Sequence, residues 1–453
     1  MQTTPKSVFA HYLVAMRDYG GSAAGYERDI RDAIAWGIDG FALNCGDWNG
    51  GFYQADTASM FAAAAAVSPD GSFKLFFSAD MSGSLNAAEI INMMTTYSSH
   101  PNYWRILQNK TAFTTENRPV LSTYAGQAGG YTTAIAFWNG QVLAPLRAQG
   151  IDPYFVPYFF ATNPDGTGIL ENPTVALMQQ SVSGLVAGLA DGALWWTIAQ
   201  CPTAPSAFTV AEAHTAACRA AGLSVMATVS PQYWGNLQVS NGRRYFEYCG
   251  GEGIQAQWNT ILNTQNPDWI EIATWNDYGE SYLNPYPDVA EYWPYALTGS
   301  VDNSVGYQKS RLGFIALNKY FAGWYKTGVQ PAPKDTLYYF YRTHPASMVA
   351  TADSLGAVTV RVTPDSNPVP DVLFVTTVLT AAAQLQVTSG NGVAQVFNVG
   401  GGMVHTRIPF QPGLQLFELT RNGVRLASAI GEPIMSQLST YNFNMTSGFA
   451  SAA

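Results

Sequence analysis

Two acidic residues three positions apart, Asp277 and Glu280, are the side chains of this sequence best suited to chemistry. They lie in the segment Glu271–Ser281, where an apolar run ends among aromatic residues. Two carboxyl groups can break a glycosidic bond, because one protonates the leaving oxygen while the other activates water or attacks the sugar. Aromatic faces nearby can stack on pyranose rings. The segment therefore predicts a glycosidase site.

Each of these acids also has a structural interpretation, which the sequence leaves open. Asp277 could cap a helix or close a turn, with Glu280 as its capping partner. Asp80 ends the apolar run Phe73–Asp80 and could act as a third acid that orients sugar hydroxyls. It could equally cap the following segment, where Ser82 offers another capping group.

The candidate sugar contacts lie inside or near the ends of expected strands. A single buried aromatic residue belongs to the core more often than to a binding platform, but several on one face would form subsites for a sugar chain. His11 could equally be a hydrogen-bonded interior histidine. The candidates are His11, Tyr12, Asn44, Tyr124, Trp196, Tyr233, Trp275, Asn276 and Tyr278.

Composition narrows the class of ligand. Only 12% of the 453 residues are charged, whereas 13% are aromatic, which favours a neutral polymer as substrate. The net charge of −9 argues against nucleic acid or an anionic membrane as a partner. The five histidines are scattered, so we expect no metal site, and no phosphate-binding or dinucleotide motif occurs. We also expect a monomer.

Four cysteines without C-x-x-C spacing predict disulfides or buried thiols, and Cys201 with Cys218 is the first pairing to consider. Glycosylation sequons at Asn109 and Asn444 are consistent with a secreted glycoprotein. The first residues lack a signal peptide's apolar segment, and no run is long enough to span a membrane. We expect an extracellular protein, in part associated with cell walls.

Residues 1–330 alternate short apolar runs with amphipathic segments, which predicts repeated βα units. Helices are expected at Tyr26–Trp36, Thr132–Ala148 and Phe208–Ala221, each followed by a glycine. Eight such units suggest a closed (β/α)8 barrel, whose active site would lie at the C-terminal ends of the strands. The expected strands are Val8–Ala15, Ile38–Asn44, Phe73–Asp80, Pro119–Gly126, Asp152–Phe160, Gly192–Thr197, Ser224–Ser230 and Trp269–Trp275.

Beyond the Pro-rich junction at Pro331–Pro333 the pattern changes to short alternating runs separated by Gly, Pro, Asn and Asp. This predicts an accessory β-sandwich domain over residues 331–453, packed against the first domain. Its expected strands are Leu337–Arg342, Ala357–Val362, Val372–Leu379, Leu385–Thr388, Gln395–Val399 and Leu414–Leu419.

The order and spacing of five segments resemble glycoside hydrolase family 71, the fungal α-1,3-glucanases or mutanases. The segments are Val8–Val14, Gly37–Asn44, Phe73–Met81, Pro119–Gly126 and Thr274–Ser281. The resemblance implies an inverting endo-type hydrolase of α-1,3-glucan with a (β/α)8 barrel, an accessory β-sandwich and no cofactor. It makes Asp277 and Glu280 the catalytic pair and Asp80 a third acid of the cleft.

Within the pair we expect Glu280 to be the general acid and Asp277 the general base, although the reverse order is physically possible. Inversion predicts a carboxyl separation of about 6.5–9.5 Å. The chain departs from the family pattern at Tyr282, where the family often has a histidine that could contact sugar. The adjacent Arg243 and Arg244 are also unfamiliar, and we expect them on a solvated surface.

Two alternatives remain. Another barrel glycosidase, such as an endo-mannosidase-like enzyme, can close a strand with a similar Trp-Asn-x-x-Gly-Glu segment, and a substrate screen would distinguish it. A secreted wall-glucan-binding protein without turnover would bind glucan and release no sugar.

Overall fold

The computed structural model describes residues 5–16, 21–109, 115–169, 173–196, 207–235, 243–285, 309–353, 359–361 and 369–452. The chain forms two compact units whose segments alternate along the sequence. The first unit comprises Met1–Thr197, Phe208–Val229 and Asn259–Asn276, and the second comprises Ile198–Ala207, Ser230–Trp258 and Asp277–Ala453. The domain boundary expected at residue 330 stays a prediction.

The first unit is built on a parallel sheet, and all eight strands expected from residues 1–330 are present in it. They are β1 (Ser7–Leu13), β2 (Gly40–Cys45), β3 (Lys74–Asp80), β5 (Thr115–Tyr124), β6 (Tyr154–Pro157), β7 (Gly192–Trp195), β8 (Ser224–Val229) and β11 (Trp269–Ile272). The strand order is β4-β5-β3-β2-β1-β11-β8-β7, with β6 also paired to β5. The strand β4 (Arg105–Asn109), which was not expected, pairs antiparallel with β5.

The ends of this sheet approach each other, because the backbone N–H of Asp191, just before β7, donates to the carbonyl oxygen of Phe155 on β6 at 2.9 Å. The strands are buried along nearly their whole length, as in parallel sheets covered on both faces. The α/β class and its curled parallel sheet are therefore confirmed.

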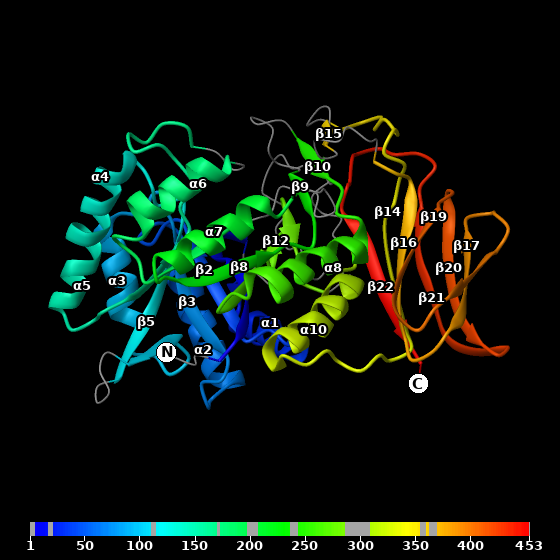
Figure 1. Cartoon of the computed structure of the whole chain (residues 1–453), viewed down its shortest axis with the longest axis horizontal. Helices are drawn as coiled ribbons and strands as arrows, with labels where there is room; N and C mark the ends of the chain where they lie inside the picture. The colour runs from blue at the N-terminus through cyan, green and yellow to red at the C-terminus, as the bar shows by residue number, and fades with distance from the viewer. Residues whose placement is uncertain are drawn as a thin grey trace. The chain divides into compact units, whose positions relative to one another are not determined.

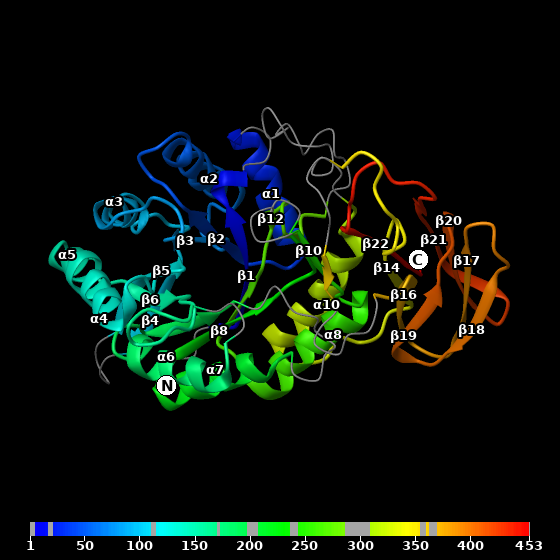
Figure 2. The same ribbon diagram turned by 90° about the horizontal axis from the view of Figure 1, so that it is seen from above.

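Helices connect the parallel strands and follow the expected stop signals. The side chain of Ser22 accepts a hydrogen bond from the backbone of Gly25 and starts α1 (Ala23–Ala35), which ends before Gly37, a residue in the left-handed region at φ 82°. In Figure 2, α2 (Tyr53–Val67) and α3 (Ala87–Tyr97) flank β2 and β3. Further helical segments include α4 (Gly130–Ile135), a π-helical stretch (Ala136–Leu143), α5 (Ala144–Ala148), α6 (Val175–Ser181), α7 (Thr209–Ala220), α8 (Gly250–Thr260) and α10 (Leu312–Thr327).

The second unit contains two four-stranded antiparallel sheets, which lie face to face (Figure 1). They share one core, to which Leu373 and Ile408 contribute from one sheet and Leu385 and Phe417 from the other. One sheet has the order β19 (Gly402–Pro409), β16 (Val372–Leu379), β14 (Thr336–Arg342) and β22 (Met445–Ser451). The other has the order β18 (Gln395–Val399), β17 (Ala383–Ser389), β20 (Gly413–Arg421) and β21 (Val424–Ile434).

Three of these strands, β19, β21 and β22, were not expected. Their sequences carry glycine, proline or charged residues inside the strand, so they lack the clean alternation that marks a half-buried strand. Neighbouring strands stabilise them in spite of this weak local preference. A short sheet of the same unit joins β9 (Tyr233–Gly235), β10 (Arg244–Phe246) and β15 (Thr359–Arg361), and β15 lies within the expected run Ala357–Val362.

Two expectations about individual side chains are wrong. Cys218 is a buried thiol free of any disulfide, as is Cys45, so the Cys201–Cys218 pairing fails; Cys201 itself lies outside the described residues. Arg243 is 1% exposed and forms an ion pair of 2.9 Å with Asp353, so it is not a solvated surface residue. Its guanidinium also lies over the Trp234 ring, which satisfies the cation inside the protein.

The sequon at Asn444 has a structural role. Its side chain is 5% exposed, and its Oδ1 accepts hydrogen bonds from Gln232 and Arg311 at 2.5 and 2.9 Å. In the folded protein the Asn444 side chain is therefore buried. Among the described residues, no helix is both long enough and apolar enough to cross a membrane.

Candidate functional site

Asp277 and Glu280 lie together in a tight hairpin of the second unit. Asp277 ends β12 (Asn276–Asp277), which pairs with β13 (Ser281–Tyr282). The backbone N–H of Gly279 donates to Oδ1 of Asp277 at 3.1 Å, and the N–H of Glu280 donates to the carbonyl oxygen of Asp277 at 3.2 Å. Both carboxylate residues remain partly exposed. The turn thus holds two acids next to each other with a path to solvent.

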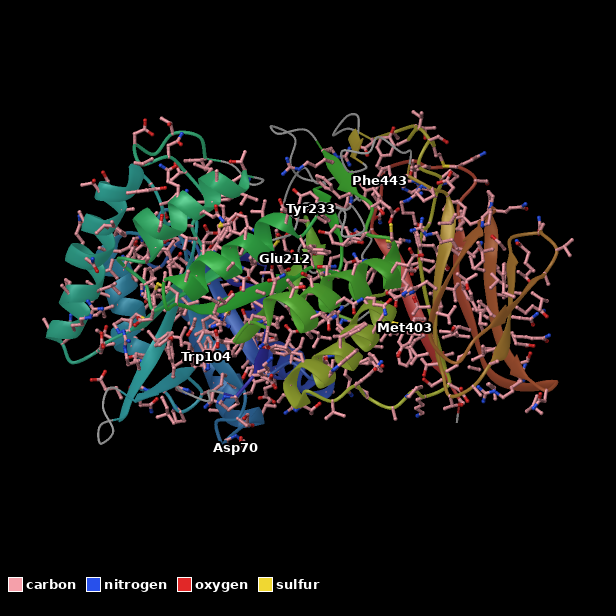
Figure 3. All side chains as sticks on the ribbon, in the orientation of Figure 1. Asp70, Trp104, Glu212, Tyr233, Met403 and Phe443 are labelled. Atoms are coloured by element: carbon pink, nitrogen blue, oxygen red, sulfur yellow. The ribbon has the colours of Figure 1, made fainter. Side chains whose placement is uncertain are left out.

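Glu280 is held from a second element, β9, which Figure 3 marks by Tyr233. The hydroxyl of Tyr233 donates to Oε1 of Glu280 at 3.3 Å, and the backbone N–H of Trp234 donates to the carbonyl oxygen of Glu280 at 2.8 Å. The Arg244 guanidinium lies 5.5 Å from the centre of the Tyr233 ring. Tyr233, proposed as a sugar contact from the sequence, therefore orients a carboxylate.

The surroundings favour a proton on this pair. Burial and the neighbouring negative charge of Glu280 raise the pKa of Asp277 well above its ordinary value, against the opposing effect of the backbone donors of the turn. Two interacting carboxyl groups titrate as one unit. The pair consequently retains a proton at a pH where isolated carboxyl groups have lost theirs, which is what acid–base catalysis requires.

Asp80 lies at the end of β3 in the first unit, where the sequence predicts it. Its Oδ2 accepts a hydrogen bond from the side-chain amide of Asn44 at 3.1 Å, and its Oδ1 accepts from the backbone and hydroxyl of Ser82 at 2.9 and 2.6 Å. The structure therefore brings Asn44 and Asp80 together at the C-terminal ends of neighbouring strands. The Ser82 contacts also give Asp80 the turn-closing role that was left open.

His11 lies on β1 and belongs to a group of polar and aromatic side chains of the first unit. Its Nδ1 is 2.6 Å from Oε1 of Glu271 on β11, and its ring packs edge-on against Trp196 with centres 4.7 Å apart. Trp196 in turn packs edge-on against Tyr124 at 5.7 Å. Trp196 thus contacts two other candidates, His11 from within β1 and Tyr124 from the end of β5.

Four other candidates are buried and serve the framework. Tyr12 donates its hydroxyl to Asp29 on α1 at 3.0 Å. The side-chain amide of Asn276 is fully used by the backbone of Leu13 and Met16, which ties the start of β12 to the end of β1. Trp275 is completely buried against Phe41, and Tyr278 is 3% exposed and packs on Tyr282.

Glu271 is a residue that reasoning from the sequence missed. It is completely buried in the middle of β11. The signal was present, since Glu271 is the one acid in the largely apolar strand expected over Trp269–Trp275, and a buried acid needs a hydrogen-bonding partner. No cluster of His, Cys, Asp and Glu able to hold a metal occurs among the described residues.

Comparison with known proteins identifies the family. The sequence profile of glycosyl hydrolase family 71 matches residues 4–453. A glucan endo-1,3-alpha-glucosidase of Schizosaccharomyces pombe is 32% identical over 98% of this chain and 94% of its own length. A mutanase of Penicillium rubens is 28% identical over 99% of this chain and 89% of its own length. An ascus wall endo-1,3-alpha-glucanase of S. pombe is 25% identical over 97% and 96%, respectively.

Among solved structures, a family 99 endo-alpha-mannosidase of Bacteroides thetaiotaomicron matches 69% of this chain and 82% of its own chain at 12% identity. Its TM-score of 0.45 is too low to carry an inference. The profile match over nearly the whole sequence is decisive, and the chain belongs to glycosyl hydrolase family 71 and is a glycoside hydrolase.

Proposed function

We propose that this enzyme hydrolyses α-1,3-glucosidic bonds of α-1,3-glucan, outside the cell or in the cell wall. The substrate is supported by the glucanase and mutanase names of relatives that align over nearly the whole chain. The chemistry is supported by one observation above all: two half-buried carboxyl groups share a turn, and partial burial of Asp277 together with the negative charge of Glu280 raises the pKa of Asp277.

In the proposed reaction the protonated member of the pair gives its proton to the glycosidic oxygen as the bond to the anomeric carbon breaks. The ionised member takes a proton from a water molecule that attacks that carbon from the opposite face, which inverts its configuration. The carboxyl separation of about 6.5–9.5 Å that inversion requires stays a prediction.

Two orders of roles are possible within the pair. The sequence led us to expect Glu280 as acid and Asp277 as base, whereas the raised pKa of Asp277 favours a resting proton on Asp277. A substrate whose leaving group needs no protonation, such as a glycosyl fluoride, separates them. The variant that lacks the acid keeps activity on the fluoride and loses it on glucan, while the variant that lacks the base loses both.

Further parts of the proposal concern sugar binding and architecture. His11, Asn44, Tyr124 and Trp196 would contact the glucan, and Asp80 would orient sugar hydroxyls. The parallel sheet would close into a complete (β/α)8 barrel, with the paired antiparallel sheets forming a β-sandwich over residues 331–453. The contacts at Asp191 and in the shared core support these two statements.

The deciding experiment incubates the protein with insoluble α-1,3-glucan and follows both the released saccharides by chromatography and their anomeric form by proton NMR. We expect α-1,3-linked oligosaccharides that appear first as the β anomer. α-1,4-Glucan and α-mannan serve as control substrates. Glucan binding without release of sugar would contradict the proposal, as would release from mannan alone, and α-anomeric products would overturn inversion.

A further inference from the structure

We infer that Glu271 is a positioning residue, which fixes His11 so that the second ring nitrogen presents a lone pair to a glucan hydroxyl. This inference rests on the proposed function for its substrate, because it gives His11 a defined partner in the sugar. It concerns the first unit alone.

The geometry ties the two side chains tightly. Glu271 is completely buried and His11 is 2% exposed, and their Oε1 and Nδ1 atoms are 2.6 Å apart. In the parallel pair β1 and β11, Glu271 lies opposite Phe9, so their side chains share one face of the sheet. His11 is two positions after Phe9 and points to that same face, where it meets Glu271. Because a carboxylate oxygen accepts hydrogen bonds, we assign the donor role in this contact to Nδ1 of His11.

The consequence for Nε2 follows from the chemistry of imidazole. When Nδ1 of a neutral ring carries the proton, Nε2 has a lone pair and accepts a hydrogen bond. Nε2 makes no hydrogen bond with the described part of the protein. The ring also packs edge-on against Trp196, which touches Tyr124, so its plane is fixed beside the aromatic side chains proposed to stack on sugar.

A purely structural role accounts poorly for Glu271. Its second oxygen, Oε2, is buried and forms no hydrogen bond with any described residue. A buried carboxylate with an unsatisfied oxygen is costly, and an apolar side chain of similar size is often as stable or more so. Because this costly carboxylate is hydrogen-bonded to His11, we infer that its role is to orient the imidazole ring.

The test uses two replacements of equal size in the full-length enzyme. Glu271→Gln keeps an oxygen that can accept from Nδ1–H, whereas Glu271→Met removes the acceptor. We expect Glu271→Met to lower kcat/KM on α-1,3-glucan oligosaccharides at least about tenfold, mainly through KM, with thermal stability unchanged or raised. Glu271→Gln should keep most of the wild-type kcat/KM.

A double-variant cycle with His11→Asn then shows whether Glu271 acts through the histidine. If it does, adding Glu271→Met to His11→Asn costs no further activity, because the two residues work as one unit. Losses that multiply would overturn the inference. So would a Glu271→Met protein of full activity.

A spectroscopic measurement without substrate completes the design. The chain has only five histidines, so selective ¹⁵N labelling gives few signals. The signal of His11 is assigned as the one that is absent from the His11→Asn spectrum. We expect ¹⁵N shifts of a protonated Nδ1 in the wild type and in Glu271→Gln, and a changed distribution of the two His11 tautomers in Glu271→Met. Unchanged imidazole shifts in Glu271→Met would refute this inference, whereas a wild-type enzyme inactive on glucan would refute the proposed function instead.

Discussion

Two aspartates of the second unit, Asp335 and Asp277, have pKa values shifted in opposite directions. Asp335, next to β14, accepts two hydrogen bonds from Arg421 at 2.7 Å and two from Thr380 at 2.9 Å, and these partners lower its pKa. Asp277 faces another acid, and its pKa is raised. A carboxylate that supports the fold is surrounded by hydrogen-bond donors that stabilise its negative charge. A carboxylate that must exchange a proton has too few such partners to stabilise its charge fully, and we call it under-compensated.

The largest effect should come from removing the under-compensated pair. Asp277→Asn and Glu280→Gln should each lower kcat on α-1,3-glucan by about 10²–10⁴-fold, because proton transfer is lost while the shape of the side chain is kept. The release of reducing sugar measures this. Glu418→Gln, a change at a partly exposed acid of β20, is the matched control and should keep full activity. An active Glu280→Gln protein would remove Glu280 from the pair.

A smaller effect should follow from Tyr233→Phe, which leaves both acids in place. The variant loses the hydroxyl that donates to Glu280, and we expect kcat to fall about tenfold with little change in KM. Tyr320→Phe removes a hydroxyl that bonds to the backbone of Pro331 and provides the comparison. Equal rates in the two variants would mean that the Tyr233 contact does not matter to catalysis.

At the compensated site the effect should appear in stability and not in turnover. Asp335→Asn should lower the midpoint of thermal unfolding by a few degrees at pH 7. Since the pKa of Asp335 is lowered in the folded protein, its stabilisation is present above the unfolded value near about 3.9 and is lost as the pH falls through the folded value. The difference between variant and wild type should therefore shrink toward strongly acidic pH. A difference independent of pH would show that the ion pair is not its cause.

The smallest expected effect has the opposite sign. Because the pKa of Asp277 is raised on folding, its ionisation costs stability as the pH rises above the unfolded value near about 3.9 and up through the folded value. Asp277→Asn should thus unfold at a slightly higher temperature than the wild type at pH 7 and at nearly the same temperature at pH 3. A variant less stable at both values would contradict the raised pKa.

Local periodicity was sufficient to predict the parallel strands, because each apolar run is buried on both faces and is bounded by a glycine or a helix signal. It failed for β21, whose pairing with β20 is stabilised by the neighbouring strand and not by its own alternation. The acids Asp277 and Glu280 were predictable as neighbours in a turn. The partner of Glu280 was not, because Tyr233 lies 47 positions earlier and meets it only in the folded chain.

The same limit applies to side chains whose surroundings are set by distant segments. Arg243 looked like a surface residue because arginine is usually solvated, and its pairing with Asp353, 110 positions away, accounts for its burial together with the Trp234 ring. Glu271 and His11 are separated by 260 positions. Sequence patterns indicate which face of an element is apolar, but they do not indicate which distant residue forms an ion pair or hydrogen bond with a buried polar side chain.

The buried thiols give the first unit two built-in reporters of local opening. Cys45 ends β2 and Cys218 lies on α7, and burial raises the pKa of each thiol to about 12. A thiolate is the species that alkylating reagents attack, so in the closed state both sulfurs are shielded by protonation as well as by packing. Their rates of alkylation under native conditions would time the transient exposure of a strand end and of a covering helix separately, without any engineered label.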